Sequence, residues 1–192
     1  MATVRTGNKT VLLVVDVQVG VVGGAWERQR IIGNIARAVE RARAAGVPVV
    51  WVQHSDEDLP FESSEWQWVP ELQPGPDEPL VHKKFNSSFE ETDLDNVLAR
   101  LGATHVVLAG AATNWCIRAT AYGALDRGYD LTLIKDAHTT DSLEFEDGTV
   151  IAAEHIITEL NVGLRWVSYP GRSSSTATAE QVDFTLAKGT GV

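Results

Sequence analysis

The chain has one cysteine, Cys116, and it lies in a segment whose pattern suits chemistry. The small residues at positions 110–112 allow a tight turn after an apolar stretch, and helical spacing begins at Cys116. A thiol at the start of a helix lies beside free backbone N–H groups, which favour a thiolate and can hold a developing oxyanion. Cys116 is therefore a candidate nucleophile for acyl transfer. The alternative is a buried cysteine that packs as a small hydrophobic side chain.

An acid and a pair of bases follow two other apolar segments. Asp16 interrupts the segment 10–17, and Lys83 and Lys84 follow the short segment 80–82. A buried carboxylate costs several kcal/mol unless it is paired, so Asp16 is either a general base for the thiol or a structural acceptor. A lysine beside both groups would lower the pKa of the thiol, although lysines are ordinarily exposed. Spacing alone does not choose between the two lysines.

The elements that must position these residues alternate along the chain. The patterns predict strands at 10–17, 47–53, 80–82, 105–109, 130–135 and 164–167, and helices at 31–45, 92–101, 116–126 and 147–160. Such alternation predicts an α/β fold with three αβα layers and a mostly parallel sheet of about six strands. We expect one domain over residues 1–192, with a loose polar tail from about residue 171.

In parallel sheets of this kind, ligands bind at the carboxyl ends of the strands. Because the acid, the lysines and the thiol each follow a predicted strand, we expect them at one edge of the sheet. The segment 54–79 is too long and too rich in proline for a simple connection, and such loops are often functional. Its aromatic residues, Phe61 among them, fit a small pocket, although core packing is the commoner fate of such side chains.

Composition limits the partners of this chain. The formal net charge is −10 and the 16 basic residues are scattered, which argues against nucleic acid. No apolar run reaches the length of a membrane span, and the N-terminal segment does not resemble a signal peptide. A single cysteine forms no internal disulfide, which suits a reducing compartment. We therefore expect a cytoplasmic protein that binds a small molecule.

Three separated motifs resemble the isochorismatase-like cysteine hydrolases. They are DVQ at 16–18, HKKFNSSFEETDL at 82–94 and the segment 110–140, and the resemblance extends from about residue 11 to residue 167. It implies a Rossmann-like parallel sheet and an Asp–Lys–Cys triad made of Asp16, Lys83 and Cys116. Lys83 is selected because it lies six residues before the family phenylalanine, here Phe89; Ser88 replaces the alanine that usually precedes it.

The resemblance also implies how the substrate is held. It implies a cis peptide bond between Ala111 and Ala112, with the N–H groups of Ala112 and Cys116 as the oxyanion hole. Family members usually form dimers or tetramers in which a neighbouring subunit helps to close the pocket, so we expect a homo-oligomer. The residues that we expect to contact the substrate are Gln18, His54, Phe61, Phe89 and Trp115.

Departures from the family pattern narrow the chemistry. Metal-dependent relatives carry a D-x-H pair after the second strand, whereas here the matching residues are His54, Ser55 and Asp56. We therefore expect no metal and no other cofactor. Isochorismatases proper typically lack the cysteine, so its presence favours hydrolysis of a C–N bond in a small amide, ureide or carbamoyl compound through a thioester. The alternatives are an isochorismatase-type ether hydrolase and a non-catalytic binding protein with the same fold.

Overall fold

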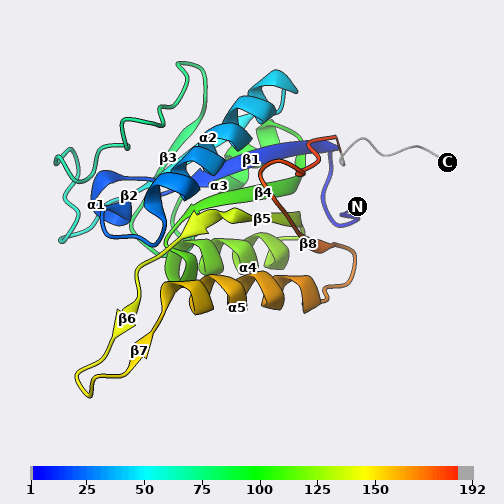
Figure 1. The fold of residues 1–192 in the computed structure, drawn as a ribbon. Coiled ribbons are helices and arrows are strands. Elements are labelled where there is room, and N and C mark those ends of the chain that lie inside the picture. Colours follow the sequence, from blue (N-terminus) through cyan, green and yellow to red (C-terminus); the bar gives the residue numbers. More distant parts are fainter. Residues whose placement is uncertain (1, 186–192) are drawn as a thin grey trace.

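In the computed structural model, which describes residues 2–185, a six-stranded sheet forms the centre of the molecule (Figure 1). All neighbouring strands are parallel, in the order β3-β2-β1-β4-β5-β8. The strands are β1 (Lys9–Val15), β2 (Val49–His54), β3 (Leu80–Lys83), β4 (Ala103–Ala111), β5 (Asp130–Thr139) and β8 (Ser174–Ala177).

Helices cover both faces of this sheet. One face packs against α2 (Arg28–Ala44), and the other packs against α3 (Leu94–Arg100), α4 (Arg118–Asp126) and α5 (Ala153–Trp166). The remaining elements are the short helix α1 (Val19–Val22) and a hairpin of β6 (Leu143–Glu144) and β7 (Val150–Ile151) that extends away from the sheet (Figure 1). The predicted three-layer α/β fold is confirmed.

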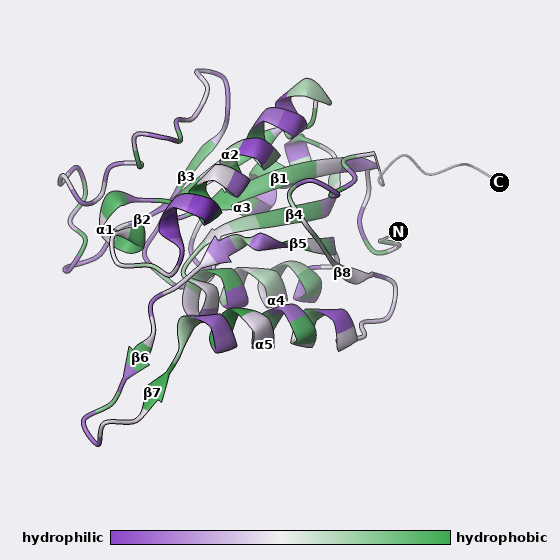
Figure 2. Cartoon of the chain, in the orientation of Figure 1, coloured by the Kyte–Doolittle hydropathy of each residue, from purple (hydrophilic) through white to green (hydrophobic). Residues whose placement is uncertain are grey.

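Strand β1 shows why the sheet needs both layers. Its residues alternate between two cores: Leu12 and Val14 face α2, whereas Val11, Leu13 and Val15 face the other three helices. All five are fully buried. A strand covered on both faces is apolar at every position, which explains the continuous hydrophobic colouring of the central strands (Figure 2).

The segment 164–167 is not the sixth strand, so that prediction is wrong. Helix α5 continues to Trp166, and its buried residues Ile156, Ile157, Leu160 and Leu164 keep helical spacing to the end. A short apolar run does not by itself distinguish a strand from the last turn of a helix. The predicted start of this helix is also wrong, because residues 147–152 include β7 and the turn before it.

The sixth strand comes instead from the segment that we expected to be a loose tail. Strand β8 pairs with β5, and after it Ala179, Val182 and Phe184 are buried against the α2 side of the sheet. Arg41 of α2 donates hydrogen bonds to two carbonyl groups of this segment. An edge strand tolerates polar residues on its open side, so the polar sequence concealed a structural element.

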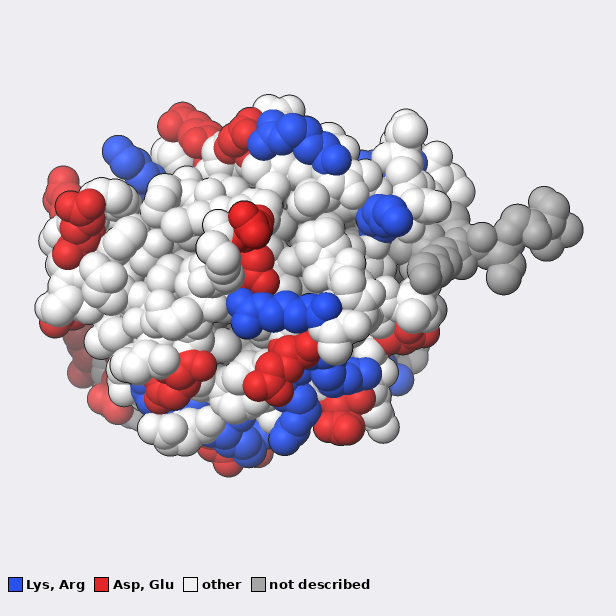
Figure 3. All heavy atoms as spheres, turned by 90° about the horizontal axis from the view of Figure 1, so that it is seen from above, with Lys and Arg blue, Asp and Glu red and all other residues white. Residues whose placement is uncertain are grey.

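Surface charge and helix length bear on which partners the protein can bind. On the face seen in Figure 3, Lys and Arg side chains lie among Asp and Glu side chains and form no continuous basic patch. Within residues 2–185, none of the helices combines the length and the apolar character needed to cross a membrane.

Packing of the C-terminal segment is testable by mutation. Phe184→Ala removes a buried ring and is expected to lower the free energy of unfolding by about 3 kcal/mol. Glu180→Ala, four residues earlier on the exposed side, is the matched control and should cost less than about 0.5 kcal/mol. Urea denaturation measures both values. A small, equal loss in the two variants would show that this segment does not pack on the sheet.

Candidate active site

The structure brings three of the predicted residues together at the carboxyl edge of the sheet. Asp16 directly follows β1, Lys83 is the last residue of β3, and Cys116 lies in a π-helical turn, Thr113–Ile117, after β4. Lys83 Nζ lies 2.6 Å from Asp16 Oδ2 and 3.2 Å from Cys116 Sγ. All three residues are buried. The arrangement combines a thiol, a carboxylate and an ammonium group within contact distance.

Strand order and backbone conformation set these positions. Asp16 has a left-handed conformation, φ 52°, and its N–H donates to the Val52 carbonyl of the neighbouring strand. The register of β2 and β3 pairs His54 with Lys83. The side chains of Asp16 and Lys83 therefore meet across the end of β2, with His54 beside them.

The turn that carries the cysteine begins with a close contact between strands. Gly110 has φ 130°, and a Cβ atom there would lie 2.0 Å from the Val15 carbonyl oxygen, so no side chain fits. The peptide bond between Ala111 and Ala112 is cis. The amides on either side of Cys116, those of Trp115 and Ile117, both donate to the Ala112 carbonyl at 3.1 Å. These bonds hold Cys116 at the start of α4.

Burial controls the charges of this cluster. Loss of water raises the pKa of Asp16, and the neighbouring Lys83 only partly offsets that rise. Burial, together with the charge of Asp16, raises the pKa of Cys116 to about 12. This burial opposes the thiolate that the helix start is expected to favour. Burial thus favours the neutral thiol beside the Asp16–Lys83 ion pair, and the raised pKa of Asp16 makes its carboxylate a stronger base.

A second carboxylate, Asp56, approaches the cluster through His54. His54 Nδ1 lies 3.3 Å from Lys83 Nζ, and its Nε2 lies 2.7 Å from Asp56 Oδ2. His54 thus contacts Lys83, a neighbour that the sequence did not predict. Among the described residues, no three His, Cys, Asp or Glu side chains are grouped so that they could hold a metal ion.

Two residues expected to contact substrate have structural surroundings instead. The Gln18 amide nitrogen donates to the carbonyls of His54 and Trp66, and its oxygen accepts from the His54 N–H. Gln18 therefore fastens the long loop to the end of β2. Phe89 is buried in the core and stacks on Tyr129 with ring centroids 6.0 Å apart. Gln18 and Phe89 thus belong to motifs that also supply site residues, but their own side chains make structural contacts.

Two of the aromatic residues expected to contact substrate are exposed. Trp115, adjacent to Cys116, is 52% exposed, and Phe61 is 55% exposed. Phe61 packs edge-on against His82 and at a tilt against Trp66. It lines a cavity of about 480 Å³ with Ser55, Asp56, Glu57 and Lys84. A cavity of about 240 Å³ reaches Lys83 and Phe85. Neither cavity is lined by Asp16 or Cys116.

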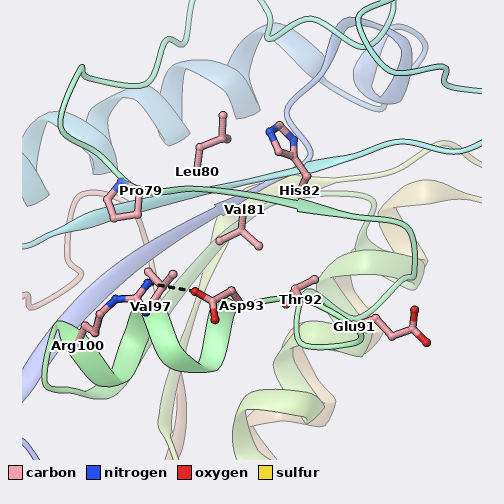
Figure 4. A pocket seen from close by; sticks show the side chains of 9 residues that line it. All are labelled: Pro79, Leu80, Val81, His82, Glu91, Thr92, Asp93, Val97 and Arg100. Carbon is pink, nitrogen blue, oxygen red and sulfur yellow. Dashed lines mark hydrogen bonds and ion pairs between the residues drawn. The ribbon is translucent and has the colours of Figure 1, made fainter.

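A larger groove, of about 700 Å³, lies elsewhere, between the edge strand β3 and α3 (Figure 4). Leu80 and Val81 line it from the strand, and an ion pair between Asp93 and Arg100 crosses its helix side. Asp16, Lys83 and Cys116 do not line this groove, so its size does not make it the reactive site.

A series of hydrogen-bonded polar side chains supports the turn that carries Cys116. His138, at the end of β5, contacts the Thr113 hydroxyl through Nδ1 at 2.9 Å and the Asn161 side-chain oxygen through Nε2 at 3.0 Å. Asn161 in turn donates to the Lys135 carbonyl. Because an amide oxygen only accepts, Nε2 carries the hydrogen and Nδ1 accepts from Thr113. These hydrogen bonds link α5 and β5 to the turn that holds Cys116.

A parallel α/β fold with a thiol, an ammonium group and a carboxylate at its carboxyl edge defines the class of this protein. A family model described as the isochorismatase domain matches residues 10–159, and the chain belongs to the isochorismatase family. A crystal structure of an isochorismatase from Pseudomonas putida agrees with the fold at a TM-score of 0.80 and 25% identity, covering 92% of this chain and 91% of that one.

Curated relatives carry more specific names. Streptothricin hydrolase of Streptomyces noursei is 37% identical over 137 residues, which cover 67% of this chain and 54% of that protein. The ureidoacrylate amidohydrolase RutB of Methylobacterium radiotolerans is 30% identical over 170 residues, covering 67% of this chain and 66% of that protein. The chain thus spans about half the length of the streptothricin hydrolases that it matches.

Burial of His138 predicts a dependence of stability on pH. Loss of water lowers the pKa of His138 to about 4 from an ordinary 6.5. The folded protein keeps the ring neutral while the unfolded chain binds a proton, so stability is lost as pH falls from about 6.5 to 4. The contribution is about 3 kcal/mol at the acid end. Urea denaturation at pH 7 and pH 4.5 should show a smaller acid loss in His138→Gln than in the wild type.

His105 is the control for this measurement. Burial also lowers its pKa, so His105→Gln reports a separate contribution with the same sign. Equal acid losses in the wild type and in His138→Gln would contradict the buried neutral state of His138.

Proposed function

We propose that this protein is a thiol-dependent hydrolase that cleaves a C–N bond of a small amide, ureide or carbamoyl compound. The observation that carries the proposal is the position of Lys83 Nζ, 3.2 Å from Cys116 Sγ and 2.6 Å from Asp16 Oδ2. The names of the relatives support the same class of bond, since they include a ureidoacrylate amidohydrolase and a nicotinamidase.

The first half of the proposed reaction forms a thioester. Asp16 accepts the Cys116 proton, and the thiolate attacks the carbonyl carbon of the substrate. Lys83 stabilises the negative charge, which moves from the carboxylate to the sulfur. The N–H groups of Ala112 and Cys116 hold the oxyanion of the tetrahedral intermediate. The C–N bond then breaks, and the nitrogen leaves as ammonia or an amine with the proton from Asp16.

The second half of the proposed reaction hydrolyses the thioester and releases the carboxylic acid product. Asp16, again a carboxylate, accepts a proton from water as the water oxygen attacks the thioester carbon. The C–S bond breaks and the proton returns to the sulfur of Cys116. The raised pKa of Asp16 suits this role, because a stronger base takes protons from both the thiol and the water.

The two adjacent lysines give a matched test of the proposal. Lys83→Ala is expected to lower kcat by about 100-fold or more, because the ammonium that stabilises the reacting charges is lost. Lys84→Ala, at an exposed neighbouring position, should leave kcat unchanged, and Cys116→Ala should abolish turnover. The measurement is ammonia release across a panel of small amides and ureides. Turnover that survives Cys116→Ala would rule out covalent catalysis.

We also propose that the protein assembles with copies of itself. The β6–β7 hairpin extends from the body of the molecule (Figure 1) and exposes Phe145, Val150 and Ile151. Apolar side chains on a projecting arm are typical of a contact between subunits.

Light scattering tests the proposed assembly. The double variant Phe145→Ser, Val150→Ser is expected to lower the mass from that of an oligomer to that of one chain. An oligomer of unchanged mass in this variant would exclude the hairpin as the contact.

A further inference from the structure

His54, the last residue of β2, lies between the proposed catalytic lysine and a carboxylate of the long loop. Its Nδ1 lies 3.3 Å from Lys83 Nζ, and its Nε2 lies 2.7 Å from Asp56 Oδ2. The His54 side chain is 14% exposed, whereas that of Asp56 is 46% exposed. The ring therefore forms the inner part of a path that leads from solvent to Lys83.

The surroundings of Asp56 fix the hydrogen on this ring. The hydrogen bond from His54, together with loop amides, lowers the pKa of Asp56, so the carboxylate is ionised and only accepts. Its other oxygen accepts from the N–H groups of Asp58 and Leu59, at 3.0 and 2.7 Å. Nε2 of His54 therefore carries the hydrogen, and Nδ1 presents a lone pair to Lys83. A second hydrogen on the ring would set a positive imidazolium against the ammonium group.

Lys83 has more acceptors than hydrogens. Its three N–H bonds face four acceptors within 3.3 Å: Asp16 Oδ2, Cys116 Sγ, His54 Nδ1 and the Phe85 carbonyl. The imidazole and the carbonyl keep their charge during the proposed reaction. Asp16 and Cys116 exchange a proton, so the negative charge moves between them. If two hydrogens stay on the fixed acceptors, the third is shared by the two groups whose charge changes.

We propose that His54 is a positioning residue that holds one N–H of Lys83, so that the remaining hydrogen follows the charge from Asp16 to Cys116. This inference rests on the proposed function because it takes Cys116 as the nucleophile. The charged groups that face His54 are Lys83 on β3, Asp56 on the loop and Asp16 after β1. Asp56 acts through His54, because it selects the ring form that accepts from Lys83.

The test follows the reactivity of Cys116 and needs no substrate. Iodoacetamide alkylates the thiolate, so the pH profile of the alkylation rate reports how well the site stabilises that anion. His54→Ala should alkylate about tenfold more slowly at neutral pH, equivalent to a rise of about one unit in the thiol pKa. His54→Asn places an amide oxygen near the position of Nδ1 and should restore most of the rate. His155→Asn, on the exposed side of α5, is the control and should match the wild type.

A kinetic readout separates positioning from mere folding. On any amide that is turned over, His54→Ala should lower kcat more than it changes KM. If His54→Ala shows the wild-type alkylation profile, the proposal is overturned.

A second variant keeps the test decisive if His54→Ala does not fold by circular dichroism. Asp56→Ala leaves the imidazole in place but removes the carboxylate that fixes its tautomer, and it should slow alkylation at neutral pH. An unchanged profile in Asp56→Ala overturns the proposal. The outcome is distinct from that of the proposed function: a panel of amides that yields no ammonia rejects the hydrolase, whereas alkylation that depends on His54 supports the positioning role by itself.

Discussion

The buried ion pair between Lys83 and Asp16 is the interaction on which the rest of the site depends. Two charges removed from water are costly unless each one stabilises the other, and breaking such a pair leaves an uncompensated charge. The pair joins β3 to the end of β1 across β2, so it requires the observed strand order. On the other side of β1, β4 delivers the turn with Cys116. The sheet therefore brings the carboxylate, the ammonium group and the thiol together.

The same burial explains why the three groups belong together chemically. A thiolate at Cys116 is disfavoured at rest, since the pKa of the thiol is raised to about 12 by burial and by the charge of Asp16. Proton transfer from the thiol to Asp16 keeps the net charge of the cluster constant, so no new charge has to be buried. The ammonium of Lys83 contacts both the starting and the final position of the negative charge. This arrangement suits the proposed reaction, in which proton transfer accompanies attack on a carbonyl.

Much of this architecture was predictable from the sequence, for reasons visible in particular residues. The fully apolar strand β1 predicted a sheet covered on both faces, and the turn before Cys116 predicted a strand-to-helix junction. Choosing Lys83 over Lys84 required the family pattern. The alternating burial in β3 also distinguishes the two lysines, because Val81 and Lys83 are buried whereas Leu80 and His82 are exposed. Period-two alternation therefore offers a physical signal for the buried lysine.

Other features depended on contacts that a local pattern does not contain. The burial of Phe184 and the pairing of β8 with β5 are long-range, and the polar sequence around Ser174 masked them. Gln18 and Phe89 belong to motifs that share segments with the site, yet one fastens a loop and the other packs in the core. The contact of His54 with Lys83 arises from the register of β2 and β3, which only the assembled sheet defines.

Acid-quenched peptide mass mapping of the protein during turnover of a small amide or ureide tests most directly whether Cys116 is the nucleophile. Attack by Cys116 predicts an acyl group on the peptide that contains this residue, present in the wild type and accumulating when attack by water is slow. Turnover without an adduct on that peptide, or an adduct at another residue, would contradict the assignment of Cys116 as the nucleophile held beside Lys83 and Asp16.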